Sequence, residues 1–146
     1  MTEDSRPALD QLNLVVGDME AMAAFYGRLG VEIADPGPPW SGHHRSASAR
    51  AGLALDLDSE TFGKVWNRGQ PDTGPRIVLG FRLADRESVD RTYAELVAAG
   101  HVGQQPPYDA FWGARYAVVE DPDGNSVGLM SPADDAHRSA PPAPPS

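Results

Sequence analysis

Cysteine is absent from this chain of 146 residues, which excludes disulfide bonds, thiolate zinc sites and a cysteine nucleophile. Basic side chains are scarce as well: 12 lysines and arginines stand against 21 aspartates and glutamates, for a formal net charge of −9. We therefore expect no nucleic-acid partner, because phosphates attract basic surfaces. No apolar run approaches the ~20 residues that cross a bilayer, and the polar N-terminus predicts no secretory signal. The expected protein is cytoplasmic and does not bind membranes.

Proline is concentrated at the C-terminal end of the chain. Five of the 14 prolines fall in the last fifteen residues, which contain no large apolar side chain. Such a segment cannot offset its ordering entropy by burial, so we predict a disordered tail over 132–146. The folded domain is expected to cover 8–131.

Strand and helix periods alternate inside this domain, which indicates an α+β fold. Alternating apolar residues predict strands, and apolar residues at helical spacing behind an aspartate N-cap predict helices. The expected elements, in chain order, are strand 12–16, helix 18–30, strand 53–58, helix 59–68, strand 77–83, helix 85–100 and a hairpin of 114–120 with 126–130.

The two halves of the chain correspond when the sequence is shifted by 67 positions. The identical pairs are Leu12 with Leu79, Asp18 with Asp85, Glu20 with Glu87, Tyr26 with Tyr93 and Leu29 with Leu96. They fall on the predicted strand, cap and helix face of each half, which indicates an internal duplication. Two half-sheets whose concave faces meet are expected to enclose a central cleft for a small ligand. We place module one at about 8–60 and module two at about 76–131.

Three segments carry a family resemblance: LNLVVGDMEAMAAFYGRLG, GFRLADRESVDRTYAELVAAG and WGARYAVVEDPDGNSVGLMSP. Together they resemble the vicinal oxygen chelate superfamily, which includes glyoxalase I, extradiol dioxygenases, fosfomycin-resistance enzymes and bleomycin-binding proteins. The resemblance implies two tandem βαβββ modules that form half-barrel sheets around a cleft. It also implies a homodimer, in which pairing of chains covers exposed strand edges.

The resemblance implies a divalent metal held by histidine and glutamate at matching places in the two modules. Here Gln11 and Val78 take the places of the two histidines, and Gly128 takes the place of the glutamate on the last strand. Asp56 is the residue that matches the remaining ligand. Valine and glycine offer no donor atom, and a neutral amide is a poor ligand for the transition metals of this family. We therefore predict no metal and no other cofactor.

Aromatic and histidine side chains supply the candidates for a ligand site. Flat organic ligands stack on such rings, although aromatic residues also dominate ordinary cores. His43 and His44 are neighbours in a predicted strand, so at most one of them faces the cleft. The predicted ligand-binding residues are Gln11, Trp40, His43, His44, Trp66, Tyr108, Phe111, Trp112 and Tyr116.

These observations favour a metal-independent small-molecule-binding protein of the bleomycin-resistance type. Its ligand would be an aromatic or cationic small molecule, such as an antibiotic or another aromatic natural product, and the acidic balance of the chain favours neutral or cationic ligands. The alternative is a glyoxalase-, dioxygenase- or isomerase-like enzyme with a displaced or absent metal, in which His43 or His44 acts with Asp56 or Gln11. A third interpretation is a partner-binding module whose cleft has lost its function.

Overall fold

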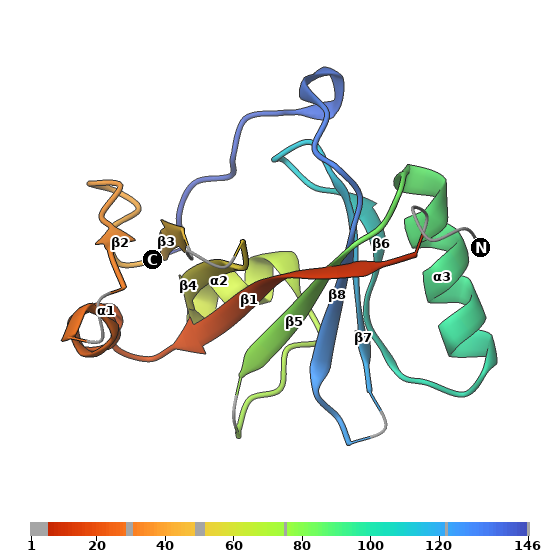
Figure 1. The fold of residues 1–146 in the computed structure, drawn as a ribbon, viewed down its shortest axis with the longest axis horizontal. Coiled ribbons are helices and arrows are strands. Elements are labelled where there is room, and N and C mark those ends of the chain that lie inside the picture. The colour runs from red at the N-terminus through yellow and green to blue at the C-terminus, as the bar shows by residue number, and fades with distance from the viewer. Residues whose placement is uncertain (1–5, 29–30, 49–51, 75, 122, 146) are drawn as a thin grey trace.

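Eight strands form one sheet in the computed structural model, which describes residues 6–28, 31–48, 52–74, 76–121 and 123–145 (Figure 1). The order across the sheet is β2-β3-β4-β1-β5-β8-β7-β6. The strands are β1 (Ala8–Val16), β2 (Ile33–Ala34), β3 (His44–Ser48), β4 (Ala54–Ser59), β5 (Ile77–Arg82), β6 (Gly103–Asp109), β7 (Arg115–Glu120) and β8 (Ser126–Met130). The helices are α1 (Met19–Arg28), α2 (Glu60–Trp66) and α3 (Arg86–Ala98), followed by a 3-10 turn, η2 (Asp135–His137).

The two modules meet at the centre of the sheet, where β1 and β5 pair antiparallel. Leu12 lies opposite Leu79 in this pair, so the two residues related by the 67-position shift face each other. Antiparallel pairing of equivalent residues is the arrangement expected when two copies of one module are related by a local two-fold axis. Outside the central pair, β1 runs parallel to β4 and β5 runs parallel to β8. The predicted α+β class with two βαβββ modules is confirmed.

Both predicted aspartate caps hold their helices. Asp18 Oδ1 accepts a hydrogen bond from the Ala21 amide at 3.0 Å, and Asp85 Oδ1 accepts one from the Ser88 amide at 2.7 Å. Each carboxylate satisfies an amide that the helix itself leaves without a partner. The predicted end of the first helix at Leu29 and Gly30 lies outside the described residues.

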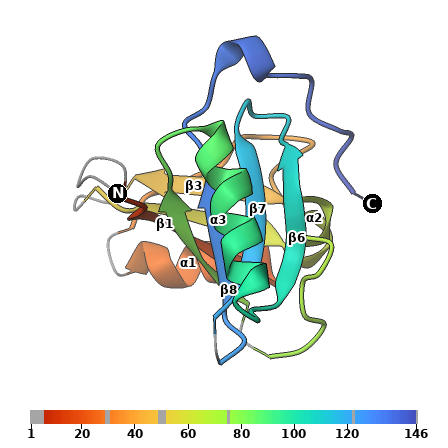
Figure 2. The same ribbon diagram turned by 90° about the vertical axis from the view of Figure 1, so that its right-hand side faces the viewer.

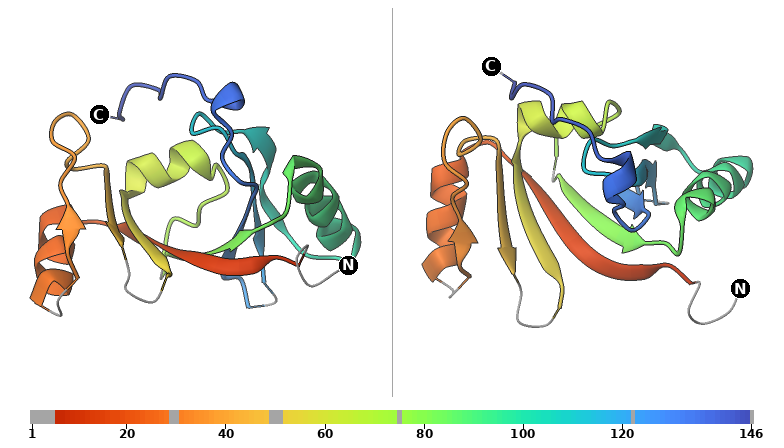
Figure 3. Two further views of the ribbon diagram at one scale, coloured as in Figure 1. Left: turned by 45° about the horizontal axis from the view of Figure 1, so that its top comes forward. Right: turned by 90° about the horizontal axis from the view of Figure 1, so that it is seen from above.

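The hydrophobic core is divided between the two faces of the curved sheet. On the outer face, Val16 packs with Met19 of α1, and Ala117 and Val119 pack with Val89 of α3. Figure 2 shows α3 covering the strands of module two. The inner-face cluster contains Val15, Phe62, Trp66, Val78, Ala110, Tyr116 and Val118. Helix α2 supplies Phe62 and Trp66, so it lies on the inner face, opposite α1 and α3 (Figure 3).

The prediction of a disordered tail is not confirmed. Residues 132–145 run from β8 across the open side of the sheet toward module one (Figure 1). The Asp134 amide donates to the Gly113 carbonyl at 3.0 Å, and the Ser139 amide donates to the Phe111 carbonyl at 3.0 Å. The tail buries little side-chain surface, but its backbone donors find acceptors in the loop before β7.

No helix in the described ranges of the chain is both long enough and apolar enough to cross a bilayer.

Candidate functional site

A cavity of about 490 Å³ opens on the inner face of the sheet, between the two modules. Its volume lies in the range typical of small-molecule sites, about 300–1,000 Å³. Seven of the nine side chains that we predicted to bind ligand line it. These are Gln11, Trp40, His44, Trp66, Phe111, Trp112 and Tyr116.

Aromatic rings form the walls of the cavity. Trp40 packs edge-on against Phe62 of α2, with ring centroids 5.0 Å apart. On the side of module two, Trp112 packs edge-on against Tyr116 at 5.5 Å and against Phe111 at 5.2 Å. These edge-to-face contacts are the geometry that ring quadrupoles favour. The walls are therefore rings that brace one another and also border open space.

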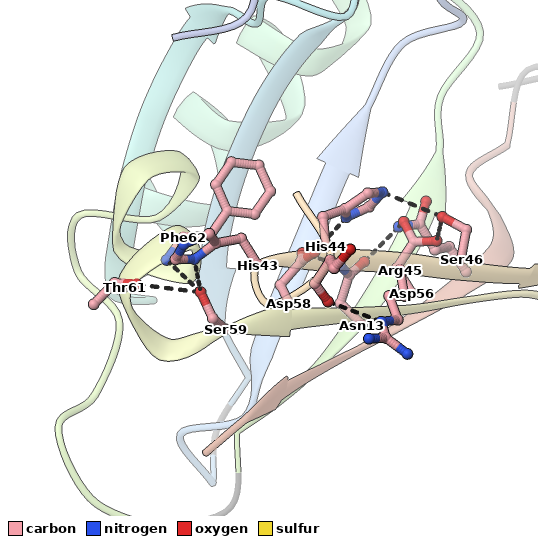
Figure 4. Close-up of polar contacts among 12 residues, drawn as sticks. Asn13, His43, His44, Arg45, Ser46, Asp56, Asp58, Ser59, Thr61 and Phe62 are labelled. Carbon is pink, nitrogen blue, oxygen red and sulfur yellow. Dashed lines mark hydrogen bonds and ion pairs between the residues drawn. The ribbon is translucent and has the colours of Figure 1, made fainter. Parts of the chain in front are cut away.

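Polar side chains of module one form the floor of the cavity. Asn13 of β1 donates from Nδ2 to Asp58 Oδ2 at 2.8 Å, and Gln11 donates from Nε2 to Asp56 Oδ2 at 2.9 Å. His44 of β3 donates from Nδ1 to Asp58 Oδ1 at 2.5 Å. Figure 4 shows Asn13 of β1 and His44 of β3 on either side of Asp58 of β4. The strand period of two explains the arrangement, because alternate residues of each strand point to the same face.

Burial and hydrogen bonding shift the pKa values of titratable side chains in the cavity. The hydrogen bond to Asp58 raises the pKa of His44 above its usual value, despite the opposing effect of burial. Burial raises the pKa of Asp56, against the lowering effect of the hydrogen bond that Ser46 Oγ donates at 2.8 Å. Burial also raises the pKa of Tyr116, so this phenol is neutral at physiological pH. The cavity therefore combines neutral aromatic walls with a titratable floor.

Two predicted residues lie outside the cavity lining. His43 precedes β3, and its Nδ1 lies 2.9 Å from Ser59 Oγ at the start of α2. Tyr108 of β6 donates from its hydroxyl to the Trp66 carbonyl at 3.3 Å and packs edge-on against Tyr116. Of the two neighbouring histidines, His44 is the one that lines the cavity.

Besides Asp56, the lining contains seven residues that were not among the predicted site residues: Asn13, Pro36, Asp58, Phe62, Gly80, Met130 and Pro141. Asn13 and Asp58 stand two positions from Gln11 and Asp56 on the same strands. That spacing already put each pair on one strand face. The two polar pairs, Gln11 with Asn13 and Asp56 with Asp58, were therefore the signal from which the polar floor could have been predicted. Phe62 is an aromatic residue close in sequence to Trp66, which was a signal for the lining, whereas the place of Met130 at the cavity depends on the position of β8.

The residues at the metal positions that the fold family implies do not fit a metal. The 67-position shift relates Asn13 to Gly80. Asn13 pairs with Asp56 in module one and Gly80 pairs with Gly128 in module two, so Asp56 and Gly128 occupy equivalent positions. Of the four positions, Gln11, Val78, Asp56 and Gly128, only Asp56 offers a charged donor. A Cβ on Gly128 would lie 2.9 Å from the Tyr116 hydroxyl oxygen, so the phenol fills the space of a ligand there. In the described part of the chain, no three His, Asp or Glu side chains are grouped to hold a metal ion.

Gly128→Ala tests this close packing. We expect it to lower the free energy of unfolding by about 1–3 kcal/mol, because Tyr116 is buried and an added methyl group overpacks its surroundings. Adding Tyr116→Phe removes the nearest atom and should recover part of the loss. Gly42→Ala is the control, since its Cβ would meet no atom within 4 Å. Urea denaturation measures all four proteins, and an unchanged midpoint for Gly128→Ala would contradict the contact.

Comparisons with known proteins agree with this architecture. The model of the Glyoxalase/Bleomycin resistance protein/Dioxygenase superfamily matches residues 8–129. A superfamily member from Vibrio splendidus 12B01 has a similar structure, with TM-score 0.56 and 14% identity over 87% of this chain and 100% of that one. The Mn(II)-bound glyoxalase from Novosphingobium aromaticivorans has TM-score 0.54 and 19% identity over 87% of this chain and 38% of that one.

A third similar structure, described as an NAD-dependent benzaldehyde dehydrogenase from Legionella pneumophila, has TM-score 0.60 and 18% identity over 83% of this chain and 96% of that one. At these identities the structural likeness concerns the fold alone. No curated protein matches the sequence. The family match covers most of the chain, and the paired modules agree with it. The chain therefore belongs to the glyoxalase/bleomycin resistance protein/dioxygenase superfamily.

Proposed function

We propose that this protein is a metal-independent small-molecule-binding protein of the bleomycin-resistance type, with an aromatic natural product such as an antibiotic as its ligand. The observation that carries the proposal is the cavity of about 490 Å³, which has aromatic walls and offers neither an imidazole nor a carboxylate at three of the four implied metal positions. Trp40, Trp66 and Trp112 all line this cavity, so a ligand inside it lies close to intrinsic fluorophores. The homodimer stays a prediction. The outermost strands of the sheet are β2 and β6, and their free edges are where chains would pair.

One observation favours the enzyme alternative as the second candidate. His44 borders the cavity and is oriented by Asp58 through its Nδ1. A histidine held in this way is suited to act as a general base. The two candidates differ in the fate of the ligand, because a binding protein returns it unchanged.

Fluorescence titration tests the proposal. After treatment with a chelator, the protein is titrated with a panel of aromatic natural products that includes antibiotics. Bound compounds are then recovered, and their masses are measured by mass spectrometry. We expect saturable quenching, unchanged affinity after chelation and unaltered compounds. Elemental analysis should find no stoichiometric Zn, Fe, Mn or Ni. Binding that requires a metal, and that is lost in Gln11→Ala, would contradict the proposal. A chemically altered compound would favour the enzyme.

A further inference from the structure

The charged groups of the cavity are distributed unequally. The floor carries two carboxylates, Asp56 and Asp58, and none of the described residues that line the cavity is a lysine or an arginine. The other titratable groups of the lining are His44 on the neighbouring strand and Tyr116, which is neutral. At most one positive charge, on His44, therefore faces two negative charges.

The partners of the two carboxylates are mainly uncharged. Asp56 receives hydrogen bonds from the Gln11 amide and the Ser46 hydroxyl. Asp58, whose exposed fraction is 2%, receives one from the Asn13 amide and one from His44. Carboxylates that are removed from water are normally paired with a cation, because hydrogen bonds from neutral groups do not cancel the charge. The floor is thus one positive charge short.

The aromatic walls would also attract a positively charged ligand. Two ring pairs line the cavity, Trp40 with Phe62 and Trp112 with Tyr116. The face of an aromatic ring attracts a cation within about 6 Å of its centroid, with indole the strongest. A positively charged group that also carries an apolar body can use the floor and the walls together.

We propose that the ligand is an organic cation, with its positively charged nitrogen against Asp56 and Asp58 and its apolar body against the tryptophan walls. This inference rests on the proposed small-molecule function and gives the charge class of the ligand. His44 is the competing cation of the free protein, since it donates to the same carboxylate.

Competition between protonated His44 and the ligand makes the affinity for the ligand depend on pH in a defined direction. The groups that face His44 are Asp58 and Asp56 from β4, the Ser46 hydroxyl of its own strand, 3.2 Å from Nε2, and the edge of the Phe62 ring. Below its raised pKa, His44 is an imidazolium and offsets one carboxylate. Above that pKa it is neutral, and both carboxylates are free to attract the ligand. The affinity for a permanent cation should therefore rise with pH.

Two isosteric probes separate charge from shape. (3-Hydroxyphenyl)trimethylammonium carries a fixed positive charge, and 3-tert-butylphenol replaces its nitrogen with carbon. At pH 8 we expect the cation to bind at least about tenfold more tightly than the neutral isostere. Asp56→Asn and Asp58→Asn should each weaken cation binding by about tenfold and leave binding of the isostere unchanged. Asp72→Asn makes the same change in net charge at an exposed carboxylate outside the cavity and should have no effect.

A pH series on the unaltered protein keeps the inference testable even where Asp58→Asn fails to fold. Between pH 6 and 9 we expect the affinity for the cation to rise and that for the isostere to stay constant. His44→Gln should abolish the rise. Equal affinity for the two probes would overturn the cation class and leave the small-molecule function standing. Failure of both probes to bind would overturn the inference, and the proposed function would also fall if the natural-product panel gave no ligand.

Discussion

Trp66→Ala is expected to lower the free energy of unfolding by about 3–5 kcal/mol, the usual cost of removing a buried tryptophan. Trp66 ends α2 and has an exposed fraction of only 4%. It packs edge-on against Tyr116, with ring centroids 6.1 Å apart, and joins α2 to the inner face of the sheet. Its indole nitrogen is buried and has no hydrogen-bond partner in the described part of the chain. The loss should therefore come from packing alone.

Val65→Ala supplies the matched control, because Val65 lies next to Trp66 on the same helix with 44% of its surface exposed. Urea denaturation of both variants should show a small change for Val65→Ala, of the order of 0.5 kcal/mol. A loss below about 1 kcal/mol for Trp66→Ala would mean that α2 does not anchor the inner face.

Local signals were sufficient to predict the modules. The caps at Asp18 and Asp85 depend on contacts within four residues, and the structure shows both. The 67-position shift predicted an internal duplication, which depends on residues far apart in sequence. The structure agrees, because Leu12 and Leu79 are opposite each other in the sheet. Duplication carries long-range information in this way, since two copies of one unit are related by symmetry.

The placement of α2 and of the tail was not predictable from local signals. The spacing of apolar residues in 59–68 predicts a short helix, but it does not determine which face of the sheet this helix covers. That choice depends on Trp66 and Phe62 packing with Val15 and Tyr116, which come from other elements. The tail likewise depends on acceptors far away in sequence, such as the Phe111 carbonyl. Asp58 alternates with the leucines of its strand, but its role in the floor depends on His44 of the neighbouring strand.

Trp112→Ala is expected to weaken binding of (3-hydroxyphenyl)trimethylammonium by about thirtyfold, which corresponds to ~2 kcal/mol for a truncated aromatic anchor. The fold should tolerate this change better than the loss of Trp66. Trp112 is half-buried, and its Nε1 donates only to Met130 Sδ, a weak acceptor, at 3.3 Å. The loop that carries it is closed by backbone bonds, from the Ala110 amide to the Ala114 carbonyl and from the Gly113 amide to the Ala110 carbonyl. These bonds remain when the side chain is removed.

Tyr108→Ala is the matched control for Trp112→Ala, because Tyr108 belongs to the same aromatic segment but lies outside the cavity lining. It should lower stability, through its lost packing on Tyr116, and leave the affinity of the folded protein unchanged. Calorimetric titration measures affinity without relying on the tryptophan signal, and thermal melting of the same samples measures stability. A large fall in melting temperature for Trp112→Ala, with unchanged affinity in the folded fraction, would place Trp112 in the core. The reverse pattern, strong loss of binding with a small change in melting, is the one expected of a ring that borders open space.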